Sequence, residues 1–370
     1  MAVDIEPYTG DIVSHTGKIV RRADLEDPAY YYEKRFSQKL IKKSGVERPE
    51  ITKVTTNFYM GCEQRCKFCY ANVSDGHHKQ NMDMRTRIRS IRKLYLLGVR
   101  LFELVGGNPT LDPNLLETLR CIKGWSGAEA GIISNSWGLN KNPNISNREE
   151  TEALKMASFR TSSFSGGSAE SHTESIGDHT GYNKNSFDTL VENMAVYSAL
   201  GYDFNILLNI NEQQSASKEI ITLMRGLNNK SINIRQLGVK LIHPVNEQRQ
   251  YSQKELNRMF RTMDNVRRKH NIPVTLANED QYSSFKVKPR YRHLKRSSDS
   301  GISQLSLGYD GKLYCTSYSI NDSDKALFGG ESICDVSSYD LGNLHQDPHY
   351  VKAMVEQRQQ TAKGFNITVS

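Results

Sequence analysis

Apolar runs and amphipathic stretches alternate along the chain from about residue 51 onward. Short runs rich in β-branched and aromatic residues predict strands, and apolar residues every three or four positions predict helices. The predicted strands are Ile51–Tyr59, Leu101–Val105, Gly131–Ser134, Phe159–Phe164, Phe204–Asn209 and Val239–Ile242. The predicted helices are Met84–Leu97, Asn114–Ile122, Arg148–Ala157, Phe187–Leu200 and Ala216–Leu227. This alternation is typical of a parallel α/β fold.

The regions that flank this alternating core have other patterns. Residues 1–50 are polar, with one helical-looking segment at Pro28–Ser44. After residue 275, two β-prone runs within Gly301–Cys315 surround an Asp-Gly pair and predict a hairpin, and a short helix is expected at Pro348–Gln357. We therefore expect an N-terminal extension (1–50), a core (51–275) and a small C-terminal extension of hairpin and helix (276–370).

Composition narrows the class of protein. A chain of 370 residues suits one large α/β domain with an appendage. The sequence shows neither the pattern of a signal peptide nor an apolar run that could cross a bilayer, so we expect a cytoplasmic protein without a membrane partner. The net charge of +8 comes largely from basic clusters at 85–93 and 286–296. Such clusters bind nucleic acid or acidic peptides, but they are more often solvated surfaces.

Three of the six cysteines, Cys62, Cys66 and Cys69, follow the first predicted strand closely. Three thiolates on one turn can bind three irons of a cubane 4Fe-4S cluster and leave the fourth iron without a protein ligand. A structural zinc site is the alternative, but it would need a fourth ligand, for which His77 or His78 lies near. A disulfide fits an odd number of cysteines poorly.

This spacing, with the aromatic Phe68 before the third cysteine, resembles the signature of the radical S-adenosylmethionine (SAM) superfamily. The resemblance implies a partial (β/α)6 barrel whose working residues project from the carboxyl ends of the strands. It also implies that the open iron binds the amino and carboxylate groups of SAM. An external reductant such as flavodoxin or ferredoxin would supply the electron that cleaves SAM to a 5'-deoxyadenosyl radical, which takes hydrogen from substrate.

The turn after the second strand, Gly106-Gly107-Asn108-Pro109, resembles the GGEP element of the same superfamily. In that element, the glycines let the backbone approach the amino group of SAM, which also meets a side-chain acceptor. Asn108 stands where the family more usually has Glu, so here a neutral amide would accept that hydrogen bond.

Further SAM-binding candidates follow the later strands. Ser134 ends the third strand, where small polar residues can line a ligand site or simply form a turn. The resemblance brings Ser163 to the ribose or carboxylate of SAM and puts Ser165 where the family commonly has Asp. Asn209 would hydrogen-bond the ribose or the methionine part, and His243 would lie near adenine.

Three other residues with reactive side chains have simpler explanations. His172 and His179 flank a Gly- and Ser-rich stretch, and we expect both on the surface of a polar loop. Cys121 ends an apolar helical run, which predicts a buried small side chain.

The C-terminal region, with its hairpin and a later Leu341-Gly342-Asn343, resembles the SPASM or twitch extension of some radical SAM enzymes. Complete extensions of this kind use more cysteines than the two available here, Cys315 and Cys334. We therefore expect a degenerate extension without an auxiliary cluster, with an incompletely ligated cluster as the alternative. Either thiol is a candidate hydrogen donor to a substrate radical, although a structural role is the simpler explanation. Apart from these, the sequence indicates no catalytic residue.

The SPASM-like pattern favours a ribosomally made peptide as substrate, as in peptide crosslinking or epimerisation during natural product biosynthesis. A small molecule, such as a sugar, a nucleoside or an antibiotic precursor, remains open. RNA is a third candidate, on basic charge alone. The non-enzyme alternative is a zinc-binding module built on Cys62, Cys66 and Cys69.

Overall fold

The protein is described by a computed structural model. The structure describes residues 3–5, 12–14, 19–21, 51–64, 66, 69, 81–96, 98–135, 147–176, 185–211, 214–242, 252–277, 289–294, 304–314 and 334–336. Several predicted features lie outside these residues: the segments Pro28–Ser44, Leu341-Gly342-Asn343 and Pro348–Gln357, and the residues Phe68, His179, His243 and Cys315.

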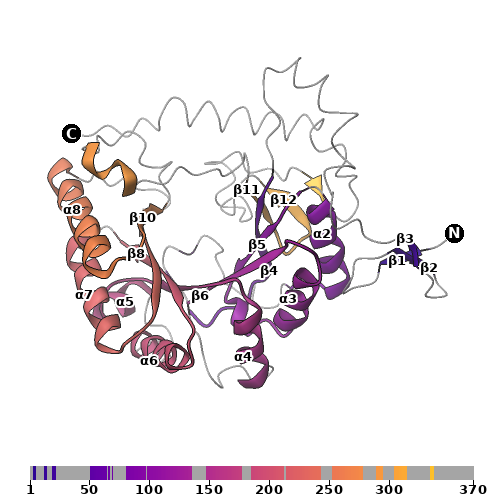
Figure 1. The fold of residues 1–370 in the computed structure, drawn as a ribbon, viewed down its shortest axis with the longest axis horizontal. Coiled ribbons are helices and arrows are strands. Elements are labelled where there is room, and N and C mark those ends of the chain that lie inside the picture. Colours follow the sequence, from indigo (N-terminus) through magenta and orange to yellow (C-terminus); the bar gives the residue numbers. More distant parts are fainter. Residues whose placement is uncertain are drawn as a thin grey trace, which may run out of the picture.

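A ten-stranded sheet forms the centre of the molecule, with the order β10-β9-β8-β7-β6-β5-β4-β11-β12-β13. All pairings from β10 across to β11 are parallel, whereas β12 and β13 are antiparallel to their neighbours. The parallel strands are β4 (Lys53–Tyr59), β5 (Leu101–Gly106), β6 (Glu129–Ser134), β7 (Phe159–Phe164), β8 (Phe204–Ile210), β9 (Ile234–Leu241), β10 (Val274–Ala277) and β11 (Gln304–Leu307). The sheet curves without closing (Figure 1), as in a partial barrel.

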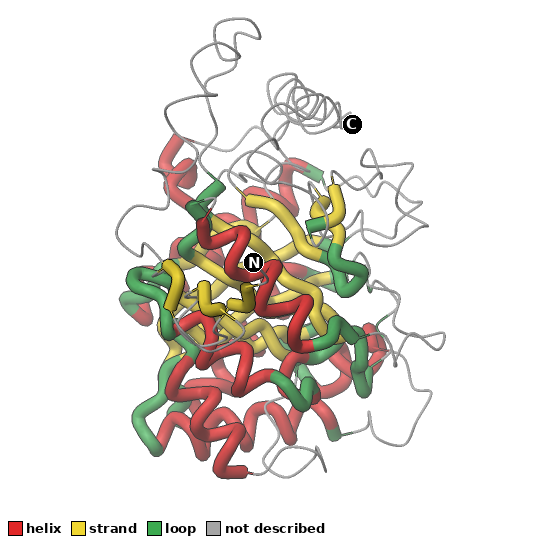
Figure 2. Tube along the Cα trace, turned by 90° about the vertical axis from the view of Figure 1, so that its right-hand side faces the viewer, coloured by secondary structure: helices red, strands yellow, loops and turns green. Residues whose placement is uncertain are grey.

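Helices cover the outer side of this curved sheet, as Figures 1 and 2 show. They alternate with the strands, so the consecutive parallel strands from β4 to β10 are joined by helical crossovers. The helices are α2 (Met84–Leu96), α3 (Leu115–Lys123), α4 (Asn147–Met156), α5 (Ala169–Ile176), α6 (Ser186–Ala199), α7 (Ala216–Asn229) and α8 (Gln253–His270). No helix in the described ranges is long and apolar enough to cross a membrane.

The predicted parallel α/β architecture is confirmed, because all six predicted strands and all five predicted helices are present within a few residues. β9 begins at Ile234 rather than Val239. α8 and β10, which the sequence pattern did not suggest, extend the repeat by one further unit. Ser252 and Glu255 form a capping box at the start of α8, which satisfies backbone N–H groups of its first turn.

The predicted hairpin around Asp310 and Gly311 is also confirmed, and it belongs to the main sheet. β11 pairs in parallel with β4, and β12 (Lys312–Tyr314) and β13 (Cys334–Asp335) continue the sheet beyond it. The side chains of Leu305, Leu307 and Leu313 are fully buried in the common core. The described part of the C-terminal region is therefore packed onto the first strand of the barrel. A separate three-stranded antiparallel sheet is formed by β1 (Val3–Ile5), β2 (Ile12–Ser14) and β3 (Ile19–Arg21).

The expected polar surface loop around His172 is wrong, because residues 169–176 form α5 and His172 is fully buried. The buried face of α5 is Ser171, His172, Ser175 and Ile176, which have helical spacing but are mostly polar. Hydrogen bonds permit this burial: Ser171 Oγ donates to the Glu219 carboxylate of α7 (2.7 Å), and Ser175 Oγ donates to the Ser171 carbonyl (2.8 Å). A periodicity of apolar residues could not reveal a helix whose buried face is made of serine and histidine. His179 lies outside the described residues.

Candidate active site

The three motif cysteines lie on the cysteine loop (residues 61–69), which leaves the carboxyl end of β4. Of this loop, the structure describes residues 61–64, 66 and 69. The Gln64 backbone N–H donates to Cys62 Sγ (3.4 Å), and the Cys66 thiol donates to Gln64 Oε1 (3.7 Å). The Cys69 N–H donates to the Cys66 carbonyl (2.9 Å). These hydrogen bonds link Cys62 to Cys66 through Gln64, and Cys66 to Cys69 through the backbone.

The turn after β5 holds the cysteine loop by its backbone. The Gly107 N–H donates to the Tyr59 carbonyl (3.0 Å), and the Asn108 N–H donates to the Gly61 carbonyl (2.7 Å). A Cβ at Gly107 would collide with that Gly61 carbonyl. Gly106 has φ +124°, a conformation that side-chain-bearing residues rarely adopt, and a Cβ there would collide with Tyr59 O. Glycine is therefore required at both positions so that β5 can approach the loop.

Asn108 is fully buried and connects three strand ends. Its Oδ1 accepts hydrogen bonds from Thr110 N (3.2 Å), Thr110 Oγ1 (2.9 Å) and Ser134 Oγ (2.7 Å). Its Nδ2 donates to both carboxylate oxygens of Glu63, at 2.8 and 3.1 Å. The oxygen that we expected to accept from SAM thus already has three protein donors. The predicted role of Asn108 as an acceptor stays a prediction, and Pro109, also buried, begins the short 3₁₀ helix η4 (Pro109–Leu111) beside it.

The end of β6 adds a second amide next to the cysteines. Asn135 Nδ2 donates to Cys62 Sγ (3.4 Å). Asn135 Oδ1 and Gln64 Nε2 are buried and have no hydrogen-bond partner within the described part of the chain. Buried polar atoms are normally satisfied, so these two atoms point to a polar group that would complete the site. Neither Asn135 nor Gln64 was predicted as a site residue, because nothing in a linear pattern shows which amide side chains will lie beside the thiols.

The end of β7 reaches the same loop from the other side. The Ser165 hydroxyl hydrogen-bonds Cys66, and the Ser165 backbone N–H donates to His172 Nδ1 (3.0 Å). Ser163 and Asn209 form a separate pair on β7 and β8, in which Asn209 Nδ2 donates to Ser163 Oγ (2.8 Å) and to the Phe164 carbonyl (3.0 Å). The structure therefore brings Ser165 to the cysteine loop, links Ser134 to the loop through Asn108, and pairs Ser163 with Asn209.

The buried imidazole of His172 supports Ser165 at the end of β7. It contacts the rings of Phe164 and Phe187 at edge-to-face angles. Burial lowers the pKa of the imidazole from 6.5 to about 4, so the ring is neutral at physiological pH. Because Nδ1 accepts from Ser165, the proton of the neutral ring is on Nε2. A neutral imidazole with a fixed tautomer holds the backbone of Ser165, whose hydroxyl meets Cys66.

The thiols interact with one another and with Glu63. Burial raises the pKa of Cys62, and the charges of Glu63, Cys66 and Cys69 add to this rise. Burial also raises the pKa of Cys66, followed by the charge of Cys69, whereas the hydrogen bond from Ser165 lowers it. In the described positions no three Cys, His, Asp or Glu side chains lie close enough together to hold a metal ion.

Two observations nevertheless make these residues a suitable setting for an iron-sulfur cluster. The thiols form a soft donor set in which Cys62 accepts hydrogen bonds from a backbone N–H and an amide, as cluster thiolates do. The buried, unpartnered amide atoms of Gln64 and Asn135 lie beside them. Cys62 and Cys69 pack against Met60, as does Tyr309 at the tip of the β11–β12 hairpin, so Met60 supplies an apolar side.

The other three cysteines are not part of the cysteine loop. Cys121 is fully buried in the hydrophobic core on α3, as predicted, and burial raises its pKa to about 12. Cys334 belongs to β13, but the structure does not describe its side chain, and Cys315 lies outside the described residues. The roles predicted for Cys315 and Cys334 stay predictions.

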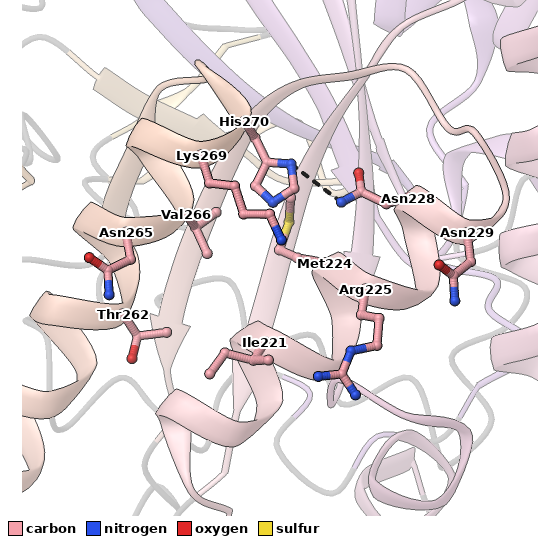
Figure 3. Close-up of a pocket in the computed structure, with 10 residues that line it drawn as sticks. All are labelled: Ile221, Met224, Arg225, Asn228, Asn229, Thr262, Asn265, Val266, Lys269 and His270. Atoms are coloured by element: carbon pink, nitrogen blue, oxygen red, sulfur yellow. Dashed lines mark hydrogen bonds between the residues drawn. The ribbon is translucent and has the colours of Figure 1, made fainter.

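A cavity of about 310 Å³ lies between α7 and α8 (Figure 3), on the outer helical layer. Arg225, Lys269 and His270 line it, and Asn228 Nδ2 and His270 Nδ1 are 3.3 Å apart. None of the site residues predicted from the sequence lines this cavity.

A family model named for the radical SAM superfamily matches residues 56–232, which run from β4 to the residues just before β9. Residues 56–232 thus form a radical SAM domain. The matched segment contains the cysteine loop and the ends of β5, β6 and β7 that contact it. The radical SAM superfamily consists of enzymes whose chemistry depends on a 4Fe-4S cluster and SAM, so the protein is a radical SAM enzyme.

Solved structures agree with the fold of this radical SAM protein. A structure of Streptococcus suis SuiB has a TM-score of 0.60 at 12% identity, covering 94% of this chain and 87% of that one. SuiB bound to its precursor peptide SuiA has a TM-score of 0.59 at 16% identity, with coverages of 84% and 68%. The protein anSMEcpe with bound AdoMet and the Cp18Cys peptide has a TM-score of 0.59 at 13% identity, with coverages of 84% and 83%. No curated protein sequence matches the chain.

Proposed function

We propose that this radical SAM protein binds a 4Fe-4S cluster through Cys62, Cys66 and Cys69 and uses SAM to modify a ribosomally made peptide. The observation that carries the proposal is the convergence of three strand ends on the cysteine loop that follows β4. β5 contributes Asn108, β6 contributes Asn135 and β7 contributes Ser165, each hydrogen-bonded to the loop. Such convergence at the carboxyl edge of a parallel barrel is where α/β enzymes bind ligands.

With SAM bound at its open iron, the cluster would supply reductive cleavage to a 5'-deoxyadenosyl radical that abstracts hydrogen from substrate. The chain's own residues would hold the cluster and shield it from water. Asn135 and the Gln64 N–H would stabilise the charge on Cys62, and Ser165 would do the same for Cys66. Met60 and Tyr309 would exclude water from one side of the loop. An electron from an external reductant such as flavodoxin or ferredoxin would be needed, which suits a reducing compartment such as the cytoplasm.

The remaining predicted residues would line the SAM site beyond the cysteine loop. Ser163 and Asn209 are held together on neighbouring strands, so one hydroxyl and one amide would face the ribose or the methionine part as a unit. The Gly106–Gly107 turn would present backbone carbonyls to the same ligand. These assignments rest on the resemblance of the segments and on their shared edge of the sheet.

A peptide is the substrate class we favour. Two of the similar structures, SuiB with SuiA and anSMEcpe with Cp18Cys, were solved with peptides. The fold likeness to both covers 84% of this chain. The same chemistry on a small molecule, such as a sugar or a nucleoside, is the second candidate. Nucleic acid rests only on the net charge of +8.

Iron and sulfide analysis after anaerobic reconstitution tests the cluster. The wild type should contain about four irons per chain, and the Cys62→Ala, Cys66→Ala, Cys69→Ala triple variant almost none. Cys121→Ala is the matched control and should keep its iron, because Cys121 is buried in the core of α3. Zinc in place of iron, with no 5'-deoxyadenosine formed under reduction, would contradict the enzyme proposal. Clearly more than four irons, with a remainder in the triple variant, would show an auxiliary cluster in the C-terminal region.

Substrate class is tested by the release of 5'-deoxyadenosine. Candidate precursor peptides encoded beside the gene should stimulate SAM cleavage and should gain or lose mass by an amount that mass spectrometry detects. Stimulation by small sugars or nucleosides, with no effect of any peptide, would favour the second candidate.

A further inference from the structure

The cavity between α7 and α8 lies in a strongly basic part of the protein. α8 and α7 with its C-cap residue Lys230 together contain nine Lys and Arg and three Asp and Glu, a formal charge of +6. The net charge of the whole chain is +8. These two neighbouring helices are thus a third basic cluster beside those at 85–93 and 286–296. Such a concentration of one sign of charge attracts an anionic partner.

The acidic side chains of this helix pair are already bound by other groups. Glu219 is buried and accepts hydrogen bonds near the start of α5, Glu255 belongs to the capping box of α8, and Asp264 pairs with two arginines of its own helix. Arg225 and Lys269 line the cavity and make no ion pair with any residue that the structure describes. Within the described part of the chain, their charges are therefore uncompensated.

The cavity is a groove with an apolar floor between these two cations. Met224 and Val266 line it and are buried, whereas Ile221 is 46% exposed. The lining residues of α7 extend over positions 221–229, which correspond to about 12 Å along the helix. Lys269 extends from α8 toward α7 (Figure 3). The groove therefore offers apolar contact along two helical turns with a positive charge from each helix.

The helix dipoles account for only one of the two cations. Lys269 lies in the last turn of α8, where a positive charge offsets the negative end of the helix dipole. The last turn of α7 contains no basic residue, so Arg225 lies outside the region in which the dipole acts. The pairing of the two charges across the groove thus indicates a bound anionic group.

The shape of the groove favours a helix as its occupant. Backbone N–H and C=O groups in the middle of a helix bond within that helix, so α7 and α8 offer no edge to which an extended peptide could add. A helix satisfies its own backbone and can place one apolar face on the floor, with acidic side chains facing the cations. None of the described lining residues is aromatic, whereas proteins that bind single-stranded nucleic acid stack bases on aromatic rings.

We propose that the groove between α7 and α8 binds an acidic amphipathic helix of the precursor peptide, outside the residues that are modified. The inference rests on the proposed function and deepens it by giving the peptide a second point of contact. In the sheet, three strands separate β8, which α7 follows, from β4, which the cysteine loop follows. Docking at the groove therefore raises the local concentration of the reacting segment without touching the cluster.

Fluorescence anisotropy with labelled synthetic peptides tests the groove. The probes are overlapping fragments of the candidate precursor peptides, and the protein is the full chain after reconstitution. The groove variant carries Arg225→Glu and Lys269→Glu. The control variant carries Lys230→Glu and Arg261→Glu, which make the same change in charge at exposed positions of the same helix pair that do not line the cavity.

We expect the groove variant to bind the acidic fragment about 10-fold more weakly than the wild type at low salt. Since salt screens exposed charges, this loss should shrink to about twofold at about 0.5 M salt. The control variant should stay within about threefold of the wild type at low salt. Ile221→Ser should weaken binding about fivefold at either salt concentration, because the loss of apolar contact is not screened.

Turnover of the full precursor peptide separates docking from damage to the active site. The groove variant should raise the KM for the peptide about 10-fold and leave kcat for 5'-deoxyadenosine release within about twofold of the wild type. Its iron content after reconstitution should equal that of the wild type, because the groove is lined by none of the residues of the candidate active site.

Four outcomes would overturn the inference. Equal peptide affinity and KM of the groove variant and the wild type would do so while the proposed function stands. Equal losses in the groove and control variants would show only a general attraction to positive charge. Tighter binding of a single-stranded RNA probe than of any peptide, lost in the groove variant alone, would assign the groove to nucleic acid. A wild type that cleaves SAM but neither binds nor modifies any precursor peptide would refute the proposed substrate class, and the inference with it.

Discussion

Replacing His172 by Asn removes a buried titratable ring and keeps a hydrogen-bond acceptor near the position of Nδ1. The imidazole has a pKa of about 4 in the folded chain, against 6.5 when exposed, because burial disfavours its charged form. The unfolded chain therefore binds more protons than the folded one between these two values. The stability that the neutral ring contributes is complete above about pH 6.5 and is lost as the pH falls toward 4.

The size of the effect follows from the two pKa values. At a pH low enough for His172 to be charged in both the folded and the unfolded chain, the free energy of unfolding is about 3 kcal/mol lower than at neutral pH. Between pH 7 and pH 5 this single group accounts for a loss of about 2 kcal/mol in the free energy of unfolding. Carboxylates and exposed histidines also titrate in this range, so the informative quantity is the difference between variant and wild type.

Urea denaturation at pH 7 and pH 5, followed by circular dichroism, measures this difference. The His172→Asn protein should start from a lower stability, because the smaller side chain leaves a gap between Phe164 and Phe187. It should then lose about 2 kcal/mol less than the wild type on acidification. His270→Asn is the comparison: burial and the charge of Lys269 also lower the pKa of His270, but this residue is partly exposed, so its replacement should change the pH dependence less than His172→Asn does. If His172→Asn and the wild type lose the same stability, the imidazole is not a buried neutral base and the reasoning fails.

Two further substitutions test the packing that positions the cysteine loop. Gly107→Ala should reduce iron loading severalfold after reconstitution, because its Cβ would push the turn after β5 away from the loop, whereas Gly226→Ala on α7 has open space and should load iron normally. Normal iron content in Gly107→Ala would show that the turn moves without cost. Asp112→Ala should lower the free energy of unfolding by about 3 to 5 kcal/mol, because it leaves the fully buried Arg87 guanidinium without its carboxylate (2.5 Å). Glu152→Ala removes an exposed ion pair and should change stability by less than about 1 kcal/mol, so equal effects of the two would refute the difference in burial.

The candidate site was predicted in part because its strongest signal is local. Cys62, Cys66 and Cys69 lie within eight positions of one another, so their spacing alone indicates one ligand set. Gly106 and Gly107 follow a strand, which made them visible as a turn. The reason why glycine is needed at these positions was not visible in the sequence. The carbonyls of Tyr59, at the end of β4, and Gly61, on the cysteine loop, lie against this turn.

The partners of the cysteines could not be predicted in this way. Asn135 and Ser165 meet Cys62 and Cys66 only because parallel strands put their carboxyl ends at one edge of the sheet. Glu63 lies within the cysteine motif, but the sequence did not show its hydrogen bonds to Asn108, because the two residues are 45 positions apart. Side-chain identity does not encode which of many distant polar groups it will meet.

The sequence by itself determined the order of strands and helices and the soft donor set on one turn, because both depend on spacing between near neighbours. It failed at α5, since a helix that buries serine and histidine has no apolar stripe. The tertiary structure alone decided that His172 is buried, that the β11–β12 hairpin extends the sheet beyond β4, and that Asn108 hydrogen-bonds Glu63. These features arise from burial and hydrogen bonding between segments far apart in the chain, which exist only after the sheet has formed.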